Sequence, residues 1–258
     1  MPRASFLSMS SLAHVSTWMQ RAVSILLPFR CPLCRTPLDN RGLCGECWRK
    51  ITFLSGPLCQ TCGTPLPFAV SQTFTCGSCL AHPPPFQELR SAFLYDEHSR
   101  ALLLHLKNRQ GLFLMPLLAH LLMRLMPSLT GPFDWVVPVP LHRRRLFKRG
   151  FNQAAPLAQQ LAQRYALTYV PFCLKRHRHT PSQGGLNIRQ RRDNVRTAFS
   201  VPNPWQQKVT GKCIVLVDDV YTTGATLSAC AKGLLAAGAK RVSALTLART
   251  PLSKNPLG

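Results

Sequence analysis

The chain of 258 residues is long enough to bury a substantial core, either as one large domain or as a small module followed by a medium-sized domain. Its 32 basic and 9 acidic residues give a formal charge of +23, which favours a polyanionic partner such as nucleic acid, a phosphorylated metabolite or an anionic membrane. The sequence has no run of roughly 18 uninterrupted apolar residues, so it predicts no membrane span.

Residues 1–28 precede the first cysteine pair and contain a moderately apolar stretch that ends in Ile25-Leu26-Leu27-Pro28. Polar residues interrupt this stretch throughout, so it lacks the continuous hydrophobic segment and the small-residue cleavage site of a secretory signal. We expect an amphipathic lead-in helix and a cytoplasmic protein. In that reducing compartment, clustered cysteines favour metal thiolates over disulfides.

Four Cys-x-x-Cys pairs between Cys31 and Cys79 hold eight of the eleven cysteines. Each pair presents two thiolates from one tight turn, and two pairs supply the four tetrahedral ligands that zinc prefers. Two zinc sites are therefore predicted, with successive pairs sharing a metal; a crossed pairing, in which the first and third pairs share one, stays open. Because all four positions of each site are filled, the zinc is expected to be structural, and a redox dithiol is the alternative. The ligands are Cys31, Cys34, Cys44 and Cys47 for one site and Cys59, Cys62, Cys76 and Cys79 for the other.

The run His82-Pro83-Pro84-Pro85 cannot continue a helix or an interior strand, and it predicts a stiff linker. Beyond it, hydrophobic periodicity predicts strands at 89–94, 134–140, 213–217 and 242–247 and helices at 99–107, 112–126, 153–165 and 226–237. A strand, a helix and a strand in succession imply a parallel sheet with right-handed crossovers. The predicted organisation is a double zinc ribbon at 29–82, a linker at 83–88, an α/β domain at 89–250 and a tail at 251–258.

The segment from Ile214 to Thr226 places two adjacent acids, Asp218 and Asp219, at the carboxyl end of an apolar strand, before a turn that opens a helix. Ligands of open parallel sheets bind at this end of the strands. We expect the two acids to accept hydrogen bonds from ribose hydroxyls or to hold Mg²⁺ through water. Backbone N–H groups at the helix N-terminus favour a phosphate, and a solvated acidic turn that caps the helix is the alternative. The predicted phosphate-binding residues are Thr222, Thr223, Gly224, Ala225 and Thr226.

This segment resembles the signature with which type I phosphoribosyltransferases bind phosphoribosyl diphosphate (PRPP). Together with the four cysteine pairs, it makes the chain similar to the ComF family of competence proteins, which includes the GntX-type DNA-utilisation proteins of Gram-negative bacteria. The similarity extends from about Cys31 to Arg249. It implies an α/β fold, a type I phosphoribosyltransferase-like parallel sheet flanked by helices and preceded by a small cysteine-rich zinc-ribbon module. It also implies PRPP with Mg²⁺ as the ligand.

The resemblance assigns roles to two basic segments as well. The segment after Pro140 corresponds to a diphosphate loop, with Arg143, Arg144, Arg145 and Arg149. The segment from Arg178 to Asn194 corresponds to a flexible loop that closes over the ligand, with Gln183, Arg189, Arg192 and Asn194. An alternative that stays open is that both segments hold a nucleic-acid backbone without sequence preference.

The function implied by the resemblance is PRPP binding in DNA uptake during natural transformation, or in the use of imported DNA. Single-stranded DNA and proteins of the DNA-uptake machinery are the implied partners. The alternative is a nucleobase or nucleotide salvage phosphoribosyltransferase, which displaces diphosphate from the ribose anomeric carbon. The sequence contains no residue that can be assigned as a catalytic base or as a nucleobase-binding residue. The missing GxxxxGK[ST] motif counts against an ATP-driven motor.

Overall fold

The computed structural model describes residues 29–66, 74–106, 109–177 and 198–251. The chain divides into two compact units, Met1–Arg49 and Lys50–Gly258. The linker predicted at 83–88 therefore lies inside the larger unit, which also holds the third and fourth cysteine pairs. Backbone contacts explain this division, because Leu89 N donates to Thr61 O at 2.8 Å and Leu54 N donates to Ala92 O at 2.9 Å.

The smaller unit is built around its two cysteine pairs. Strands β1 (Phe29–Arg30) and β2 (Pro37–Leu38) pair antiparallel, and helix α2 (Gly45–Arg49) follows. Cys31 N donates to Thr36 O, and Arg35 N donates back to Cys31 O, each at 2.8 Å. These bonds close the tight turn that carries the first pair; of the second pair, Cys44 directly precedes α2 and Cys47 lies within it.

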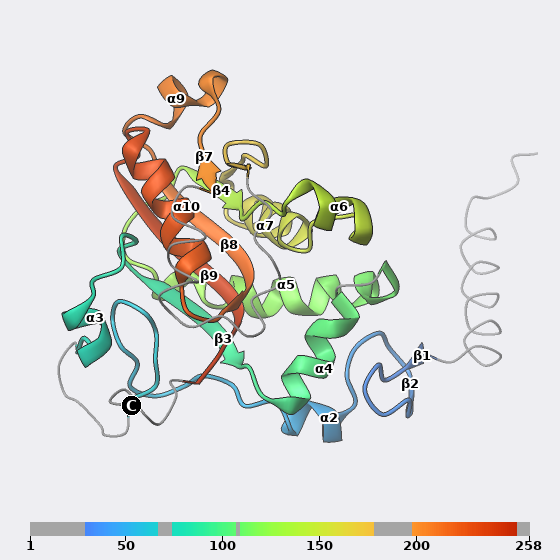
Figure 1. The fold of residues 1–258 in the computed structure, drawn as a ribbon. Helices are drawn as coiled ribbons and strands as arrows, with labels where there is room; N and C mark the ends of the chain where they lie inside the picture. Colours follow the sequence, from blue (N-terminus) through green and yellow to red (C-terminus); the bar gives the residue numbers. More distant parts are fainter. Residues whose placement is uncertain (1–28, 67–73, 107–108, 178–197, 252–258) are drawn as a thin grey trace, which may run out of the picture. The chain divides into compact units, whose positions relative to one another are not determined.

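A five-stranded parallel sheet organises the larger unit (Figure 1). Its strands, in spatial order, are β3 (Leu89–Leu94), β9 (Arg241–Arg249), β8 (Cys213–Tyr221), β4 (Trp135–Pro138) and β5 (Thr168–Tyr169). Near-continuous apolar runs form β4, β8 and β9 because both faces of these strands are covered. The α/β fold class predicted from the sequence is confirmed.

The order of the strands places a crevice at one edge of the sheet. From β4 the chain moves outward to β5, and it then returns to form β8 on the other side of β4. Neighbouring connections therefore leave β4 and β8 in opposite directions, which opens a crevice at the carboxyl ends of these two strands. At the far side, β3 pairs with β9, and Ser91 Oγ lies 2.6 Å from Thr246 Oγ1 across that pair.

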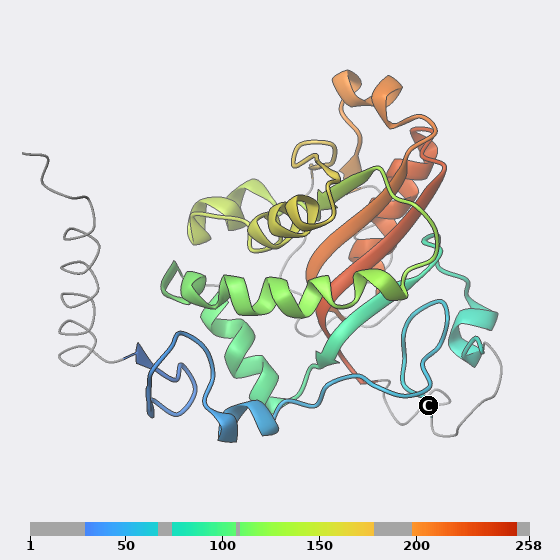
Figure 2. The same ribbon diagram turned by 180° about the vertical axis from the view of Figure 1, so that it is seen from behind.

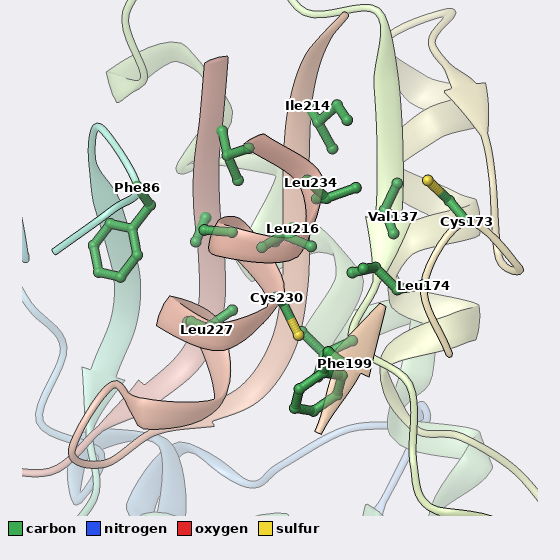
Figure 3. Packing of buried hydrophobic residues seen from close by; sticks show 14 of the residues in the cluster. Phe86, Val137, Cys173, Leu174, Phe199, Ile214, Leu216, Leu227, Cys230 and Leu234 are labelled. Atoms are coloured by element: carbon green, nitrogen blue, oxygen red, sulfur yellow. The ribbon is translucent and has the colours of Figure 1, made fainter. Parts of the chain in front are cut away.

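Helices cover both faces of the sheet. Helix α10 (Ala225–Ala236) lies on one face, and α4 (Glu97–Leu106), α5 (Met115–Met123) and α7 (Ala154–Arg164) lie on the other (Figure 2). On the α10 side, Leu227, Cys230 and Leu234 pack against sheet residues such as Leu216 (Figure 3). Burial of these apolar side chains, each fully or almost fully removed from water, is the main term that stabilises the unit.

The segment Gly111–Ser128 is long and apolar enough, by length and composition, to cross a membrane, and 44% of it is buried inside the structure. It differs from the single helix predicted at 112–126. Residues Arg109–Leu114 and Met126–Ser128 form 3-10 turns, and α5 lies between them, with prolines near the starts of α5 and the second turn. Because Leu118 and Leu122 are fully buried in the larger unit, we interpret the segment as part of its core.

Two small elements flank the sheet. Strands β6 (Lys175–Arg176) and β7 (Phe199–Ser200) pair antiparallel, and helix α9 (Asn203–Val209) follows them. Buried residues of this region, among them Cys173 and Phe199, join the core under α10. The sequence analysis did not predict these elements, because two-residue strands carry no hydrophobic period.

Candidate functional site

A cavity of about 780 Å³ lies at the crevice between β4 and β8. Its walls come from the residues that follow β4, from helix α6 (Arg143–Arg149), from the start of α7 and from the end of β8. The polar and charged side chains that line it are Tyr95, Arg145, Lys148, Arg149, Asn152, Gln153, Arg176, Asp218, Asp219, Thr222 and Thr226. The cavity is thus rich in both carboxylates and cations.

Asp218 and Asp219, which the sequence predicts to bind the ribose, both line this cavity. Strand β8 runs past the predicted end at 217 to Tyr221, so the two acids belong to the strand itself. Successive side chains of a strand point to opposite faces, which directs one carboxylate to each side of the sheet rim. Burial, reinforced by the charge of Asp219, raises the pKa of Asp218 well above its usual range. The site therefore holds a carboxylate that is costly to ionise without a cation nearby.

The turn that the sequence predicts to bind phosphate follows Tyr221 directly. Thr222 and Thr226 line the cavity, while Thr223, Gly224 and Ala225 form the turn between them and open the 12-residue helix α10. Gly224 has a φ of +75°, and a Cβ there would lie 2.7 Å from the Tyr221 hydroxyl, so the position requires glycine for two reasons. The free N–H groups at this helix start face the carboxyl edge of the sheet, where an anion is favoured.

Helix α6 supplies the positive side of the cavity. The sequence predicted a diphosphate loop here, but the segment is a helix whose N-terminus is capped by His142 Nδ1, which accepts from Arg144 N at 3.2 Å. Arg145 and Arg149, four residues apart, share one helical face and line the cavity together with Lys148. Partial burial and the neighbouring Arg149 lower the pKa of Arg145.

The other two predicted arginines do not line this cavity. Arg143 and Arg144 are exposed and border a second hollow of about 660 Å³, together with Leu146, Phe147 and Gly150. Phe147 is 92% exposed, the largest exposure of any large hydrophobic side chain among the described residues. The helical period thus separates the four arginines into two pairs with different surroundings.

Several polar cavity residues, among them Asn152, Gln153 and Arg176, were not among the predicted site residues. Asn152 secures the chain after β4, because its Nδ2 donates to Val139 O at 3.0 Å. The buried Gln153 has an Nε2 atom with no hydrogen-bond partner among the described residues, which leaves a donor for a ligand or a water. Arg176 is 7% exposed, and burial and the charge of Arg145 lower its pKa, while Cys230 and Asp218 oppose that effect. No local motif marks Arg176, since its position depends on the pairing of β6 with β7.

The residues predicted for a flexible loop, Gln183, Arg189, Arg192 and Asn194, lie outside the described residues. Their roles stay predictions. The strands that precede and follow this part of the chain pair with each other, in the register Arg176 with Phe199.

The eight cysteines form two clusters, one in each compact unit. Cys31, Cys34, Cys44 and Cys47 make the first, and Cys59, Cys62, Cys76 and Cys79 make the second, with the sulfur atoms of each within 4.8 Å of one another. Successive pairs are therefore combined, and the crossed pairing is wrong. A tetrahedral Zn–S₄ centre requires sulfur atoms about 3.8 Å apart, and the Cys62 and Cys76 sulfurs lie 3.7 Å apart.

The donor chemistry of both clusters fits zinc. Backbone N–H groups donate to the sulfurs, from Cys47 to Cys44 at 3.4 Å and from Cys76 to Cys59 at 3.3 Å. In the second cluster, hydrogen bonding with Cys62 lowers the pKa of Cys59, which favours the thiolate form that binds metal. Two four-cysteine zinc sites are consistent with this arrangement, as the sequence predicted.

The fold and the two kinds of site define a protein with cysteine-rich zinc ribbons and a phosphoribosyltransferase domain. Residues 22–80 match the sequence profile of the double zinc ribbon domain, and residues 148–256 match that of the phosphoribosyl transferase domain. The DNA utilization protein YhgH of Salmonella typhimurium (strain LT2) is 36% identical over 234 residues, which are 88% of this chain and 99% of that protein. The chain belongs to the ComF/YhgH family, and the resemblance seen in the sequence is confirmed.

Two further relatives carry competence names. Competence protein F of Haemophilus influenzae is 33% identical over 229 residues, which are 86% of this chain and 97% of that protein. Competence protein ComFC of Bacillus subtilis is 28% identical over 262 residues, which are 93% of this chain and 92% of that protein. The similarity thus spans both the ribbons and the phosphoribosyltransferase domain.

Proposed function

We propose that the cavity binds PRPP together with Mg²⁺. The observation that carries this proposal is the division of charge in one cavity, with Asp218 and Asp219 at the end of β8 and Arg145, Lys148 and Arg149 on α6. PRPP has the matching chemistry, since its ribose hydroxyls need acceptors and its two phosphate groups need cations or N–H donors. A pocket lined only by cations, or only by carboxylates, would suit either the phosphate groups or the ribose hydroxyls but not both.

Each part of PRPP has a candidate partner. The turn at 222–226 and the start of α10 receive the 5-phosphate, where the helix dipole adds to the N–H donors. Asp218 and Asp219 accept from the ribose hydroxyls, directly or through the water shell of Mg²⁺. Arg145 and Arg149 hold the diphosphate with paired N–H donors. When bound, Mg²⁺ supplies electrostatic stabilisation of diphosphate charge.

The measurement that tests this proposal is titration calorimetry with PRPP in the presence and absence of Mg²⁺. Replacing Asp219 with Asn removes a charged acceptor, a loss of about 1.5–3 kcal/mol or about ten- to hundredfold in affinity. Asp134→Asn is the matched control, because Asp134 lies at the amino end of the sheet and binds Cys213 N through an oxygen that Asn retains. PRPP affinity that is unchanged in Asp219→Asn, or absent in the parent, contradicts the proposal.

We further propose that the chain acts on DNA that enters or is used by the cell, since its relatives are named for DNA utilization and competence. The supporting observation is the surface of α6 opposite the cavity, where Phe147, Leu146, Arg143 and Arg144 surround a hollow. Single-stranded nucleic acid binds to surfaces that combine an aromatic ring for base stacking with cations for phosphates. Salvage of a free nucleobase remains the alternative function, and it predicts base-dependent release of diphosphate from PRPP.

Fluorescence anisotropy with a labelled oligothymidylate tests the DNA proposal directly. We expect binding at low salt and a linear fall of log affinity with log salt, with a slope of about −0.7 for each phosphate contact. Phe147→Ala should weaken binding by about 1–3 kcal/mol if one base stacks on the ring. If the parent protein shows no affinity at low salt, direct contact with DNA is ruled out.

A further inference from the structure

Arg249, the last residue of β9, is an arginine without a carboxylate partner in the interior of the larger unit. It is only 2% exposed. Among the described residues it forms no salt bridge with Asp or Glu, and its Nε has no hydrogen-bond partner. A buried guanidinium is strongly destabilising unless a counter-charge lies close to it. The surroundings of Arg249 must therefore supply negative charge in another form.

The second cysteine cluster supplies it. Arg249 Nη1 donates to the carbonyl oxygen of Cys62 and lies 3.8 Å from the Cys62 sulfur. Four thiolates around one divalent cation carry a net charge of −2, so the loaded cluster is an anion buried beside this guanidinium. The guanidinium thus lies against both the backbone and the sulfur of one ligand of the cluster, so the position of Cys62 fixes the position of Arg249.

Arg249 also contacts the phosphate-binding turn. It lies opposite Tyr221 in the register of β9 and β8, and its guanidinium carbon is 5.3 Å from the centre of the Tyr221 ring. A cation over an aromatic ring is attracted to its electron-rich face. The same tyrosine fills the space beside Gly224, where no Cβ fits. The ring therefore connects the guanidinium to the backbone of the turn.

Hydrogen bonds of Thr250 reinforce this link. Thr250 N donates to Tyr221 O at 2.9 Å, and Thr250 Oγ1 donates to Thr222 O at 3.3 Å. The residues that leave β9 are thus fixed to the residues that leave β8. A displacement of Arg249 would be transmitted to the turn by two routes, the Tyr221 ring and the backbone of Thr250.

We propose that Arg249 is a positioning residue that couples metal binding in the second cysteine cluster to the conformation of the phosphate-binding turn at 221–226. With the metal present, the thiolates hold the guanidinium in place, and the guanidinium holds Tyr221 against Gly224. Without the metal, Cys62 is no longer held as a ligand, so Arg249 and the turn lose this support. The part of this inference that concerns ligand affinity rests on the proposed PRPP site, whereas the part that concerns the turn does not.

The first test needs no ligand. It compares amide hydrogen exchange at 221–226 in the parent and in variants, all in the presence of zinc. Cys79→Ser, which disables the second cluster, should speed exchange in the turn, while Cys34→Ser in the first cluster should leave it unchanged. Arg249→Met should speed exchange as Cys79→Ser does and should lower zinc affinity about 10- to 100-fold, as the loss of outer partners of metal ligands commonly does. Zinc affinity is read by competition with a chromophoric chelator.

Two variants keep this test decisive. Arg241→Met is the matched control, because Arg241 begins the same strand and stacks on Phe133 at the opposite end of the sheet. Arg249→Lys keeps the charge but not the planar fork, so it should fold and show an intermediate loss of zinc affinity if Arg249→Met does not fold. Parent-like exchange in the turn of either Arg249 variant, or of Cys79→Ser, overturns the coupling.

The second test measures PRPP binding by calorimetry in the same variants. We expect Arg249→Met and Cys79→Ser to weaken PRPP about tenfold or more, in line with the cost of removing an outer support of a site, and Arg241→Met to bind as the parent does. If the parent binds no PRPP, the proposed ligand is wrong and the exchange experiment alone decides the inference. If the parent binds PRPP and Arg249→Met binds it equally well, the coupling to the ligand site is wrong.

Discussion

Replacing Arg145 and Arg149 together with alanine is expected to abolish measurable PRPP binding, whereas the same exchange at Arg143 and Arg144 should leave it nearly unchanged. The first pair lines the cavity that holds Asp218 and Asp219, and the second pair borders the hollow beside Phe147. Two lost charge-assisted contacts amount to about 3–6 kcal/mol, or roughly 10²- to 10⁴-fold in affinity. Calorimetry with PRPP and Mg²⁺ measures this difference.

With single-stranded DNA as the ligand we expect the reverse result: the Arg143 and Arg144 double variant should lose affinity, and the Arg145 and Arg149 double variant should bind nearly as the parent does. Arg143→Ala with Arg144→Ala should weaken oligothymidylate binding and make the salt slope shallower by about 0.7 for each lost phosphate contact. Both pairs remove two charges from the same seven-residue helix, so each serves as the control for the other. Equal effects of the two pairs on both ligands would mean that α6 acts only through its total charge.

Replacing Asp218 with Asn is expected to stabilise the ligand-free protein at neutral pH and to abolish PRPP binding. Burial and the charge of Asp219 raise the pKa of Asp218 above the ordinary value of 3.8, so ionising it in the folded protein is unfavourable. Between 3.8 and the raised pKa, the folded state binds more protons than the unfolded state does. Stability therefore falls as pH rises through this window, and above it the penalty is fully present.

Thermal unfolding of both proteins from pH 4 to pH 8 measures this effect. Asp218→Asn should show a higher Tm at pH 8 and little difference at pH 4, where the parent side chain is already protonated. Calorimetry on the same samples should show the loss of PRPP binding. A parallel decrease in Tm at every pH would mean that the carboxylate of Asp218 is needed for folding rather than for the ligand. Functional sites commonly contain groups of this kind, which lower the stability of the protein but are needed for its function.

Much of the fold could be predicted because it depends on local patterns. The apolar runs of strands β3, β8 and β9 and the amphipathic pattern of helix α7 predict elements that the folded chain contains. The cysteine clusters and the adjacent acids were found in the same way, since their spacing along the chain defines the chemistry. These features need no knowledge of which distant residues will meet.

The rest of the site depends on contacts between distant parts of the chain. Helix α6 has three consecutive arginines and only two apolar residues, so no apolar stripe predicted it, and its division into two pairs follows from the helical period. Arg176 reaches the cavity only because β6 pairs with β7. Arg249 is an ordinary strand residue in the sequence, and its role depends on Cys62, 187 residues away.

The pairing of β3 with β9 has a consequence for how the protein is made. Ser91 and Thr246, which meet across this pair, are 155 residues apart, so the first strand of the sheet finds its neighbour only when the last strand has left the ribosome. Long-range parallel pairing of this kind forms slowly, because the entropy of closing the loop is lost before the contacts form. During synthesis, the cysteines of the second cluster are complete long before Arg249 exists. The ligands for the second metal site are therefore all synthesised before the strand that completes this edge of the sheet.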